Sequence, residues 1–319
     1  MNSPGLPPLF DHRWLLFTGK GGVGKTTMVA SLAVHAASRG LRPLIVEMGH
    51  RESMRAVFGV DEIGFKPRDV GLGVHAMSID IDLAVLDYMM QHIPSRRIAK
   101  SIVNNPVLER LFKAMPAVGE IATINKLRQL EAEKLSDGRP RWAPLLVDLD
   151  ATGHALMFLE LRKTLEHIMG TGPMRKLIES TAEMFADPAR TRLALVTTPD
   201  ELPVTETIQL YARLRDAGTV AWSGVFVNRV PQLPFDAEAE PSLANLAVAA
   251  RAVADAEIQA DVAFGELAWA RAARARNQID RLRAAVDLPI VELPRLTADR
   301  LHGRDLALLG ALAAQGGRA

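Results

Sequence analysis

The sequence of 319 residues contains no cysteine. Disulfides, iron-sulfur clusters, thiolate zinc sites and cysteine nucleophiles are therefore excluded together. The chain also lacks an excess of charge of either sign, because 38 basic and 37 acidic residues leave a formal net charge of +1. Since neutralisation of phosphates by basic residues dominates affinity for nucleic acids, we expect no nucleic-acid partner.

Long apolar runs are absent as well. No stretch of about 18 apolar residues occurs, and residues 1–13 lack the basic and then apolar pattern of a secretory signal. We therefore expect a cytoplasmic protein without stable membrane insertion. The eight histidines form no HxxxH or HExxH pair, so we interpret them as surface or packing residues.

With 48% hydrophobic and 24% charged residues, the composition is that of a globular protein. Short apolar runs predict strands, and apolar residues at helical spacing predict helices between them. The strands are expected at 14–18, 43–47, 144–149, 192–198, 221–228 and 288–293, and the main helices at 26–38, 158–166, 203–217 and 297–314. This alternation predicts an α/β fold with a doubly wound, mostly parallel sheet. Residues 1–319 are expected to form one domain, with helical insertions at about 83–135 and 160–189 and long helices at about 242–286.

A glycine-rich loop follows the first expected strand and precedes a helix. It satisfies the pattern GxxxxGK[ST] with the residues Gly19-Lys20-Gly21-Gly22-Val23-Gly24-Lys25-Thr26. Glycines let backbone N–H groups turn inward around phosphates, the Lys25 ammonium neutralises phosphate charge, and the Thr26 hydroxyl can bind Mg²⁺. The loop therefore predicts a P-loop that binds a nucleotide together with Mg²⁺.

The second residue of this loop is a lysine, and the segment KGGxGKT resembles the deviant Walker A class, which includes the MinD/ParA proteins and the arsenite-pump ATPases. In that class the lysine reaches across a dimer to the nucleotide of the partner subunit. The resemblance therefore implies a homodimer, or a heterodimer with a related ATPase subunit, in which Lys20 assists catalysis in trans. A loop lysine without that role is the alternative.

The segment Asp148-Leu149-Asp150-Ala151-Thr152-Gly153-His154 follows another expected strand. It resembles the signature D-x-x-P-T-G-H of the arsenite-pump and tail-anchor-targeting ATPase family, with Ala151 in place of the proline. The resemblance implies that Asp148 holds a Mg²⁺-bound water beside Thr26. It also implies that His154 is a switch element.

Two later segments extend the resemblance. The strand end around Asn228 resembles the adenine-recognition segment of the family, and the Asn228 amide offers both a donor and an acceptor for an adenine edge. Leu293-Pro294-Arg295-Leu296 resembles a second family segment. The resemblance thus implies that ATP is the nucleotide and that Thr27, Asn228 and Pro294 join residues 19–26 in binding it.

The sequence departs from the family at the segment after the second expected strand. Relatives carry an aspartate there that orients the attacking water, and by counting from the strand that position is Gly49. Glycine cannot orient water, so slow hydrolysis, or catalysis assisted by Glu47, Glu52 or a second subunit, is expected. We expect Gly49→Asp to raise phosphate release if the backbone at Gly49 is not restricted to glycine.

The metal chemistry of relatives also cannot transfer, because both arsenite binding and the zinc at the targeting factors' dimer interface use cysteines. A hydrophobic client helix or a membrane-protein partner is a further implication of the resemblance. The methionine-rich segments 86–98 and 165–185 are the candidate groove, although methionine at helical spacing is more often core.

We therefore predict an ATP-binding and ATP-hydrolysing dimeric switch protein, with Lys20, Lys25, Glu47 and Asp148 as the catalytic residues. Two alternatives remain open. One is a nucleotide-dependent regulatory or structural subunit with weak or no turnover, which Gly49 favours. The other is a MinD/ParA-like positioning ATPase, which the weakly basic C-terminal helix disfavours.

Overall fold

The computed structural model describes residues 8–49, 53–92, 118–149, 173–217, 220–233, 240–253, 255–298 and 301–316. These residues form one sheet of eight strands in the order β3-β4-β2-β5-β1-β6-β7-β8. The strands are β1 (Trp14–Thr18), β2 (Leu44–Met48), β3 (Arg68–Gly71), β4 (Val74–Ile79), β5 (Leu145–Asp148), β6 (Thr191–Thr197), β7 (Ala221–Val230) and β8 (Ile290–Pro294). Every neighbouring pair is parallel except β3 and β4. The predicted doubly wound, mostly parallel sheet is confirmed.

Strands β3 and β4 are absent from the sequence prediction. They form an antiparallel hairpin at the sheet edge. Of the four residues of β3, Val70 is buried and the other three are exposed. A short polar edge strand has no apolar run to mark it. The turn between the two strands has left-handed backbone at Gly71, Leu72 and Gly73.

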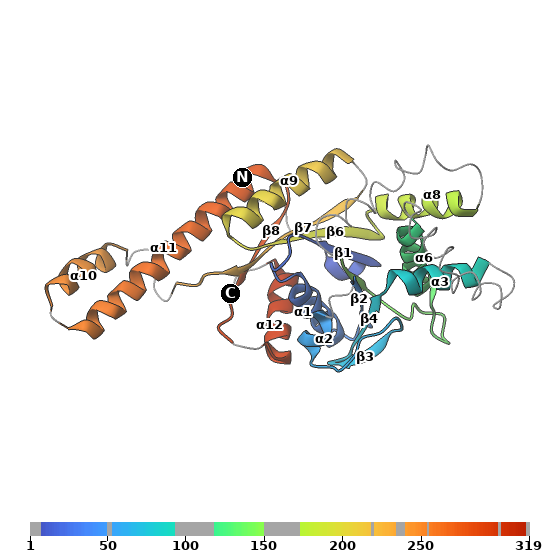
Figure 1. The fold of residues 1–319 in the computed structure, drawn as a ribbon, viewed down its shortest axis with the longest axis horizontal. Helices are drawn as coiled ribbons and strands as arrows, with labels where there is room; N and C mark the ends of the chain where they lie inside the picture. Colours follow the sequence, from blue (N-terminus) through green and yellow to red (C-terminus); the bar gives the residue numbers. More distant parts are fainter. Residues whose placement is uncertain are drawn as a thin grey trace.

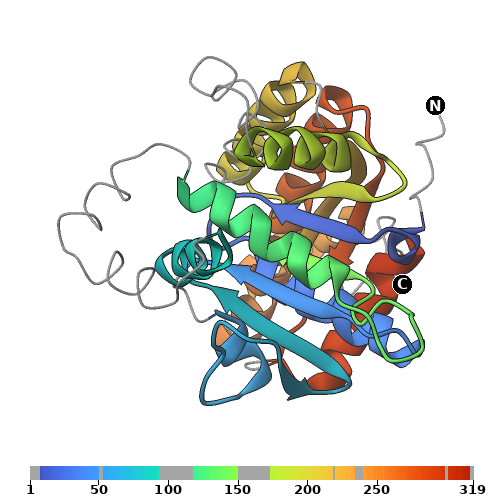
Figure 2. The same ribbon diagram turned by 90° about the vertical axis from the view of Figure 1, so that its right-hand side faces the viewer.

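Helices cover both faces of the sheet, as Figures 1 and 2 show. One face packs against α1 (Lys25–Ser38) and α12 (Gly303–Gln315), and the other packs against α6 (Val118–Ala132), α8 (Pro173–Ala186), α9 (Glu201–Ala217) and part of α11 (Ala256–Ala285). Neighbouring strand residues alternate between the two cores: Leu16 and Val147 contact one, Leu15 and Leu146 the other. Strands buried on both faces explain why they read as continuous apolar runs.

The remaining elements are a short 3₁₀ helix η1 (Leu9–Asp11) and helices α2 (Ser53–Phe58), α3 (Ile81–His92) and α10 (Glu240–Ala252). Helix α6 lies within the insertion expected at about 83–135, α3 begins two residues before that insertion, and α8 lies within the one expected at about 160–189. The extent of both insertions stays a prediction, because residues 93–117 and 150–172, with the expected helix at 158–166, lie outside the described residues. Of the methionines considered for a groove, Met89 and Met184 are buried in the core.

Helices α10 and α11 form a hairpin that projects from the sheet, at the left of Figure 1. The C-terminal half of α11 packs on the domain through Ala275, Ile279 and Leu282, which are buried. The other half extends outward together with α10 and exposes Phe264 and Leu267. Among the described residues, no helix combines the length and the apolar character needed to cross a bilayer.

Candidate functional site

The loop of residues 19–26, hereafter the phosphate loop, connects β1 to α1 at the carboxyl edge of the parallel strands. Its backbone is left-handed at Gly22 and Gly24, and α1 begins at Lys25. Such a turn directs successive N–H groups inward at a helix N-terminus, which makes an anion-binding concavity. Lys25 is buried, and its ammonium donates to the carbonyl oxygens of Gly19 at 3.0 Å and Lys20 at 3.2 Å.

A pocket of about 210 Å³ lies against this loop. Its lining includes Gly22, Gly24, Lys25, Thr26, Glu47, Met48, Ser53, Asp148, Leu149 and Arg229. The Thr26 hydroxyl donates to Oδ2 of Asp148 at 2.7 Å. These two residues are 122 positions apart in the chain and meet because β1 and β5 are neighbouring parallel strands. The structure thus brings together the two residues predicted for Mg²⁺.

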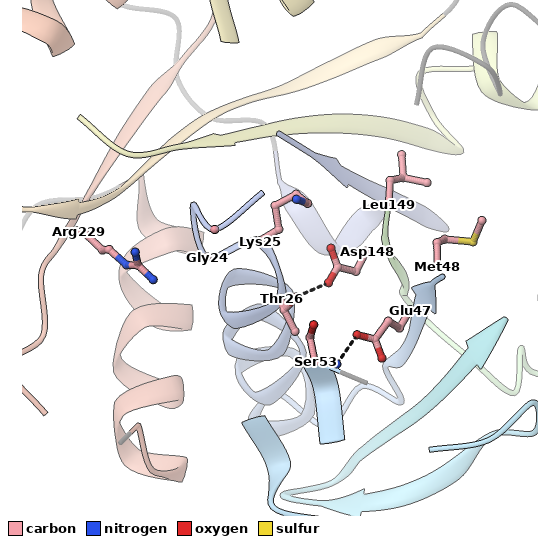
Figure 3. A pocket seen from close by; sticks show the side chains of 10 residues that line it. Gly24, Lys25, Thr26, Glu47, Met48, Ser53, Asp148, Leu149 and Arg229 are labelled. Atoms are coloured by element: carbon pink, nitrogen blue, oxygen red, sulfur yellow. Dashed lines mark hydrogen bonds between the residues drawn. The ribbon is translucent and has the colours of Figure 1, made fainter. Parts of the chain in front are cut away.

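Glu47 lies beside Asp148, because the two residues are register partners on β2 and β5. Its Oε1 accepts from the backbone N–H groups of Ser53 at 2.8 Å and Met54 at 3.3 Å, so it caps the start of α2. Figure 3 shows the Glu47 carboxylate directed toward Ser53 and the Asp148 carboxylate directed toward Thr26. Oε2 of Glu47 is buried and has no hydrogen-bond partner among the described residues.

The environment of Glu47 disfavours its charge. Burial raises the pKa of this carboxyl, and the negative charge of Asp148 raises the pKa further, while the hydrogen bonds from Ser53 and Met54 lower it. Two buried carboxylates side by side repel each other, and a divalent cation between them would relieve the repulsion. The donor set therefore fits Mg²⁺, which prefers a few oxygen ligands together with phosphate oxygens and water. Within the described ranges, no group of three or more His, Cys, Asp and Glu side chains forms a fuller metal site.

Gly49 has φ of 89°, in the left-handed region. Its carbonyl accepts from the Ser78 hydroxyl at 3.3 Å, which ties the end of β2 to β4. The condition attached to the expected gain from Gly49→Asp is therefore not met, because a side chain is strained in this conformation. Glu52 and the segment 150–154, including His154, lie outside the described residues.

Lys20 makes a contact that the sequence did not predict. Its ammonium lies 2.7 Å from Oε1 of Glu206, on the neighbouring helix α9. The two side chains are 31% and 34% exposed, so the ion pair is at the surface and contributes at most about 1 kcal/mol. Lys20 is therefore paired within its own chain, by a contact whose loss requires little free energy.

The side-chain amide of Asn228 is hydrogen-bonded to the backbone of the phosphate loop and to the backbone of Arg229. Nδ2 donates to the carbonyl of Val23 at 3.0 Å, and Oδ1 accepts from the N–H of Arg229 at 2.9 Å. A Cβ at Gly24 would lie 2.3 Å from this Nδ2, so glycine is required there by close approach as well as by φ. The contact of Asn228 with adenine stays a prediction. Thr27 is half-buried in the first turn of α1, and Pro294 ends β8.

A second cavity, of about 810 Å³, lies next to the first. It is lined by Pro199, Asp200, Glu201, Arg229, Pro231, Arg271, Arg274, Ala275, Asn277, Gln278, Arg295 and Leu296. Arg229 lines both cavities. We call the second cavity the arginine hollow, after Arg229, Arg271, Arg274 and Arg295. The sequence interpretation missed these arginines, although Arg229 and Arg295 directly follow two residues that it singled out.

The comparisons with known proteins agree with this site. The sequence profile described as anion-transporting ATPase matches residues 12–178. The chain is similar to the ATPase BagA of Mycobacterium tuberculosis (strain ATCC 25618 / H37Rv), with 26% identity covering 99% of this chain and 97% of the relative. It is also similar to the arsenical pump-driving ATPase of Acidiphilium multivorum, with 29% identity covering 64% of this chain and 37% of that protein. For the ATPase GET3C of Arabidopsis thaliana the identity is 24%, covering 71% of this chain and 69% of the relative.

These matches confirm the resemblance inferred from the phosphate loop and the Asp148 segment, because relatives of both the arsenical-pump and the GET3 type are found. The profile begins at residue 12 and contains the phosphate loop, Glu47 and Asp148. The chain belongs to the anion-transporting ATPase family.

Proposed function

We propose that this chain binds Mg·ATP in the phosphate loop and hydrolyses it slowly, as a dimeric switch that couples its nucleotide state to a partner. The observation that carries the proposal is the 2.7 Å hydrogen bond from Thr26 to Asp148 at the floor of a glycine-rich loop. In P-loop proteins a hydroxyl and a strand-end carboxylate in this relation hold the metal that bridges the phosphates.

Each residue then has a role that follows from its position. The N–H groups of the phosphate loop and the Lys25 ammonium bind the phosphate oxygens, where negative charge must be compensated. Thr26 and Asp148 hold Mg²⁺, directly or through water, and Glu47 faces the same side. Bound there, Mg²⁺ would supply positive charge to the phosphate oxygens.

Slow turnover is favoured by the switch segment. Gly49 has no side chain to orient water, and Glu47 already caps α2 through Oε1. Oε2 of Glu47, which has no hydrogen-bond partner in the part of the chain that the structure describes, would then contact a water or the metal shell. If Glu47 orients the attacking water, Glu47→Gln should abolish turnover while ATP still binds.

The dimer is part of the proposal because the Lys20 ammonium pairs with Glu206 in its own chain and, in a dimer, would instead pair with a phosphate of the partner subunit's nucleotide. Lys20 is at the surface and held by one ion pair, so its side chain can reach another subunit at small cost. A trans lysine would add charge at the transferring phosphate in the manner of an arginine finger. In this proposal a client helix or a membrane-protein partner is what the chain binds or releases when its nucleotide state changes.

The test is to follow phosphate release and sedimentation of the purified chain with and without Mg·ATP. ATP-dependent association with slow release supports the proposal. Association without any release supports the regulatory or structural alternative, in which the chain binds ATP but does not turn it over. If Mg·ATP causes no association and no phosphate is released, the proposed switch is contradicted.

A further inference from the structure

The arginine hollow concentrates positive charge that the rest of the described chain does not neutralise. The guanidinium groups of Arg229, Arg271, Arg274 and Arg295 make no ion pair or side-chain hydrogen bond with another described residue. Two other arginines of α11 behave differently, since both Arg276 and Arg283 pair with Glu292 on β8. Four such guanidinium groups around one cavity, with two carboxylates, Asp200 and Glu201, among its described lining residues, favour an anionic or aromatic ligand.

The arginine hollow and the pocket at the phosphate loop share one lining residue. Arg229 lines both cavities, and its left-handed φ of 59° is unusual for a residue with a side chain. Its N–H donates to Asn228, which in turn donates to Val23 of the phosphate loop. Figure 3 shows Arg229 on the side of the loop opposite to Asp148 and Glu47.

The position of the hollow at the edge of the sheet indicates that it binds the same ligand as the phosphate loop. Pro199 follows β6, Arg229 lies near the end of β7 and Arg295 follows β8, so the hollow lies at the carboxyl ends of three successive parallel strands. Ligands of open α/β sheets bind at this edge. With the metal side of the loop formed by Thr26 and Asp148, the nucleoside of a bound nucleotide extends to the other side, toward the hollow.

The contribution of α11 is new with respect to the site deduced from the sequence. We propose that Arg271 and Arg274 of α11 bind the nucleoside half of ATP, through its base and its first phosphate, and that α11 thereby senses the nucleotide. A guanidinium can stack on a base and donate to a phosphate oxygen. This inference rests on the proposed function, because it requires ATP in the phosphate loop.

Helix α11 is long enough to transmit the effect of a bound nucleotide from the hollow to the hairpin. Arg271 and Arg274 lie on α11 between its packed half, which contains Ile279, and its projecting half, which exposes Phe264 and Leu267. A continuous helix joins the two halves, so a ligand that restrains the arginines also restrains the base of the α10–α11 hairpin. The exposed apolar residues of the hairpin would then be presented differently with and without ATP.

The test compares Arg271→Gln/Arg274→Gln with the charge-matched control Arg251→Gln/Arg276→Gln, whose positions lie on α10 and α11 of the same hairpin but do not line the hollow. ATP and inorganic tripolyphosphate are the two probes, and calorimetry gives both affinities. We expect the first variant to bind ATP about tenfold more weakly, with tripolyphosphate affinity nearly unchanged and the control close to wild type. Hydrogen exchange of residues 256–275 should slow with ATP in the wild type and not in the first variant.

Equal ATP affinity in the first variant and the control would overturn the inference. So would an equal loss of ATP and tripolyphosphate affinity, which would indicate general electrostatics. Unchanged ATP affinity with lost binding of a polyglutamate peptide would assign the hollow to an acidic protein partner, and would also overturn the inference. Failure of the proposed function is distinguishable, because the wild type itself would then not bind ATP.

Discussion

The Lys20 ammonium lies 2.7 Å from the Glu206 carboxylate of the same chain. The lysine that resembles a trans-acting residue is therefore bound in cis, and the two arrangements exclude each other. Because the pair is partly exposed, its contribution is at most about 1 kcal/mol, which corresponds to about a fivefold change in an equilibrium constant.

Glu206→Gln should strengthen ATP-dependent association by up to about fivefold, because Lys20 no longer has to leave a carboxylate. Lys20→Ala should weaken association, since the charge in trans is lost. Sedimentation over a range of protein concentrations with Mg·ATP measures both. If both variants associate as the wild type does, Lys20 does not act across the dimer.

Replacement of Gly49 should cost stability and restore no activity. Aspartate and asparagine have nearly the same shape and adopt left-handed backbone more readily than other residues with a side chain, so either one at φ of 89° costs at most about 1–2 kcal/mol. We expect both Gly49→Asp and Gly49→Asn to lower the melting temperature and neither to raise phosphate release. A several-fold rise in release with Gly49→Asp alone would show that a carboxylate at this position orients water after all.

Asn228→Ala should weaken ATP and GTP binding alike, because the side chain braces the phosphate loop through Val23 and Arg229. Loss of a buried hydrogen-bonding amide costs about 1–3 kcal/mol. Competition of the two nucleotides against a labelled ATP analogue measures the effect. A loss of preference for ATP over GTP, with phosphate affinity retained, would instead support the adenine contact predicted from the sequence.

His75 should make the chain less stable in acid. Burial against Trp142 lowers the pKa of the His75 imidazole below its ordinary 6.5, Asp69 raises this pKa, and Arg42 and Arg141 lower it. The unfolded chain therefore binds more protons than the folded chain as pH falls below about 6.5, so stability is lost on acidification.

His75→Phe keeps an aromatic ring against Trp142 and removes the titration. Its melting temperature should fall less than that of the wild type between about pH 8 and about pH 5.5. Some loss should remain, because burial and Arg39 also lower the pKa of His35. Parallel melting curves for variant and wild type across this range would contradict the assignment.

The parts of the molecule that the sequence predicted are those with a local signal. Strands such as β1 and β5 are short apolar runs beside a glycine or an aspartate, and the phosphate loop is a contiguous motif. Strand β3 was missed because an exposed edge strand carries no such run. Figure 2 shows the hairpin of β3 and β4 at one edge of the sheet.

Contacts between distant segments could not be predicted from these signals. Lys20 and Glu206 are 186 positions apart, and nothing in either segment specifies the other. Arg271 and Arg274 occur in an alanine- and arginine-rich helix, where the same pattern also produced the paired Arg276. All three are exposed, and only the position of α11 beside the strand ends determines that Arg271 and Arg274 line the hollow while Arg276 does not.

The central claim is that Lys25, Thr26 and Asp148 form a site for Mg·ATP, and the most direct measurement is the melting temperature with saturating nucleotide. A ligand that binds only the folded state at 100 times its Kd stabilises it by about 2.7 kcal/mol. We predict that Mg·ATP raises the melting temperature of the wild type, that Lys25→Ala removes the rise, and that Asp148→Asn removes the part that depends on Mg²⁺. A wild-type melting temperature that does not change with Mg·ATP, or a rise that Lys25→Ala leaves intact, would contradict the account.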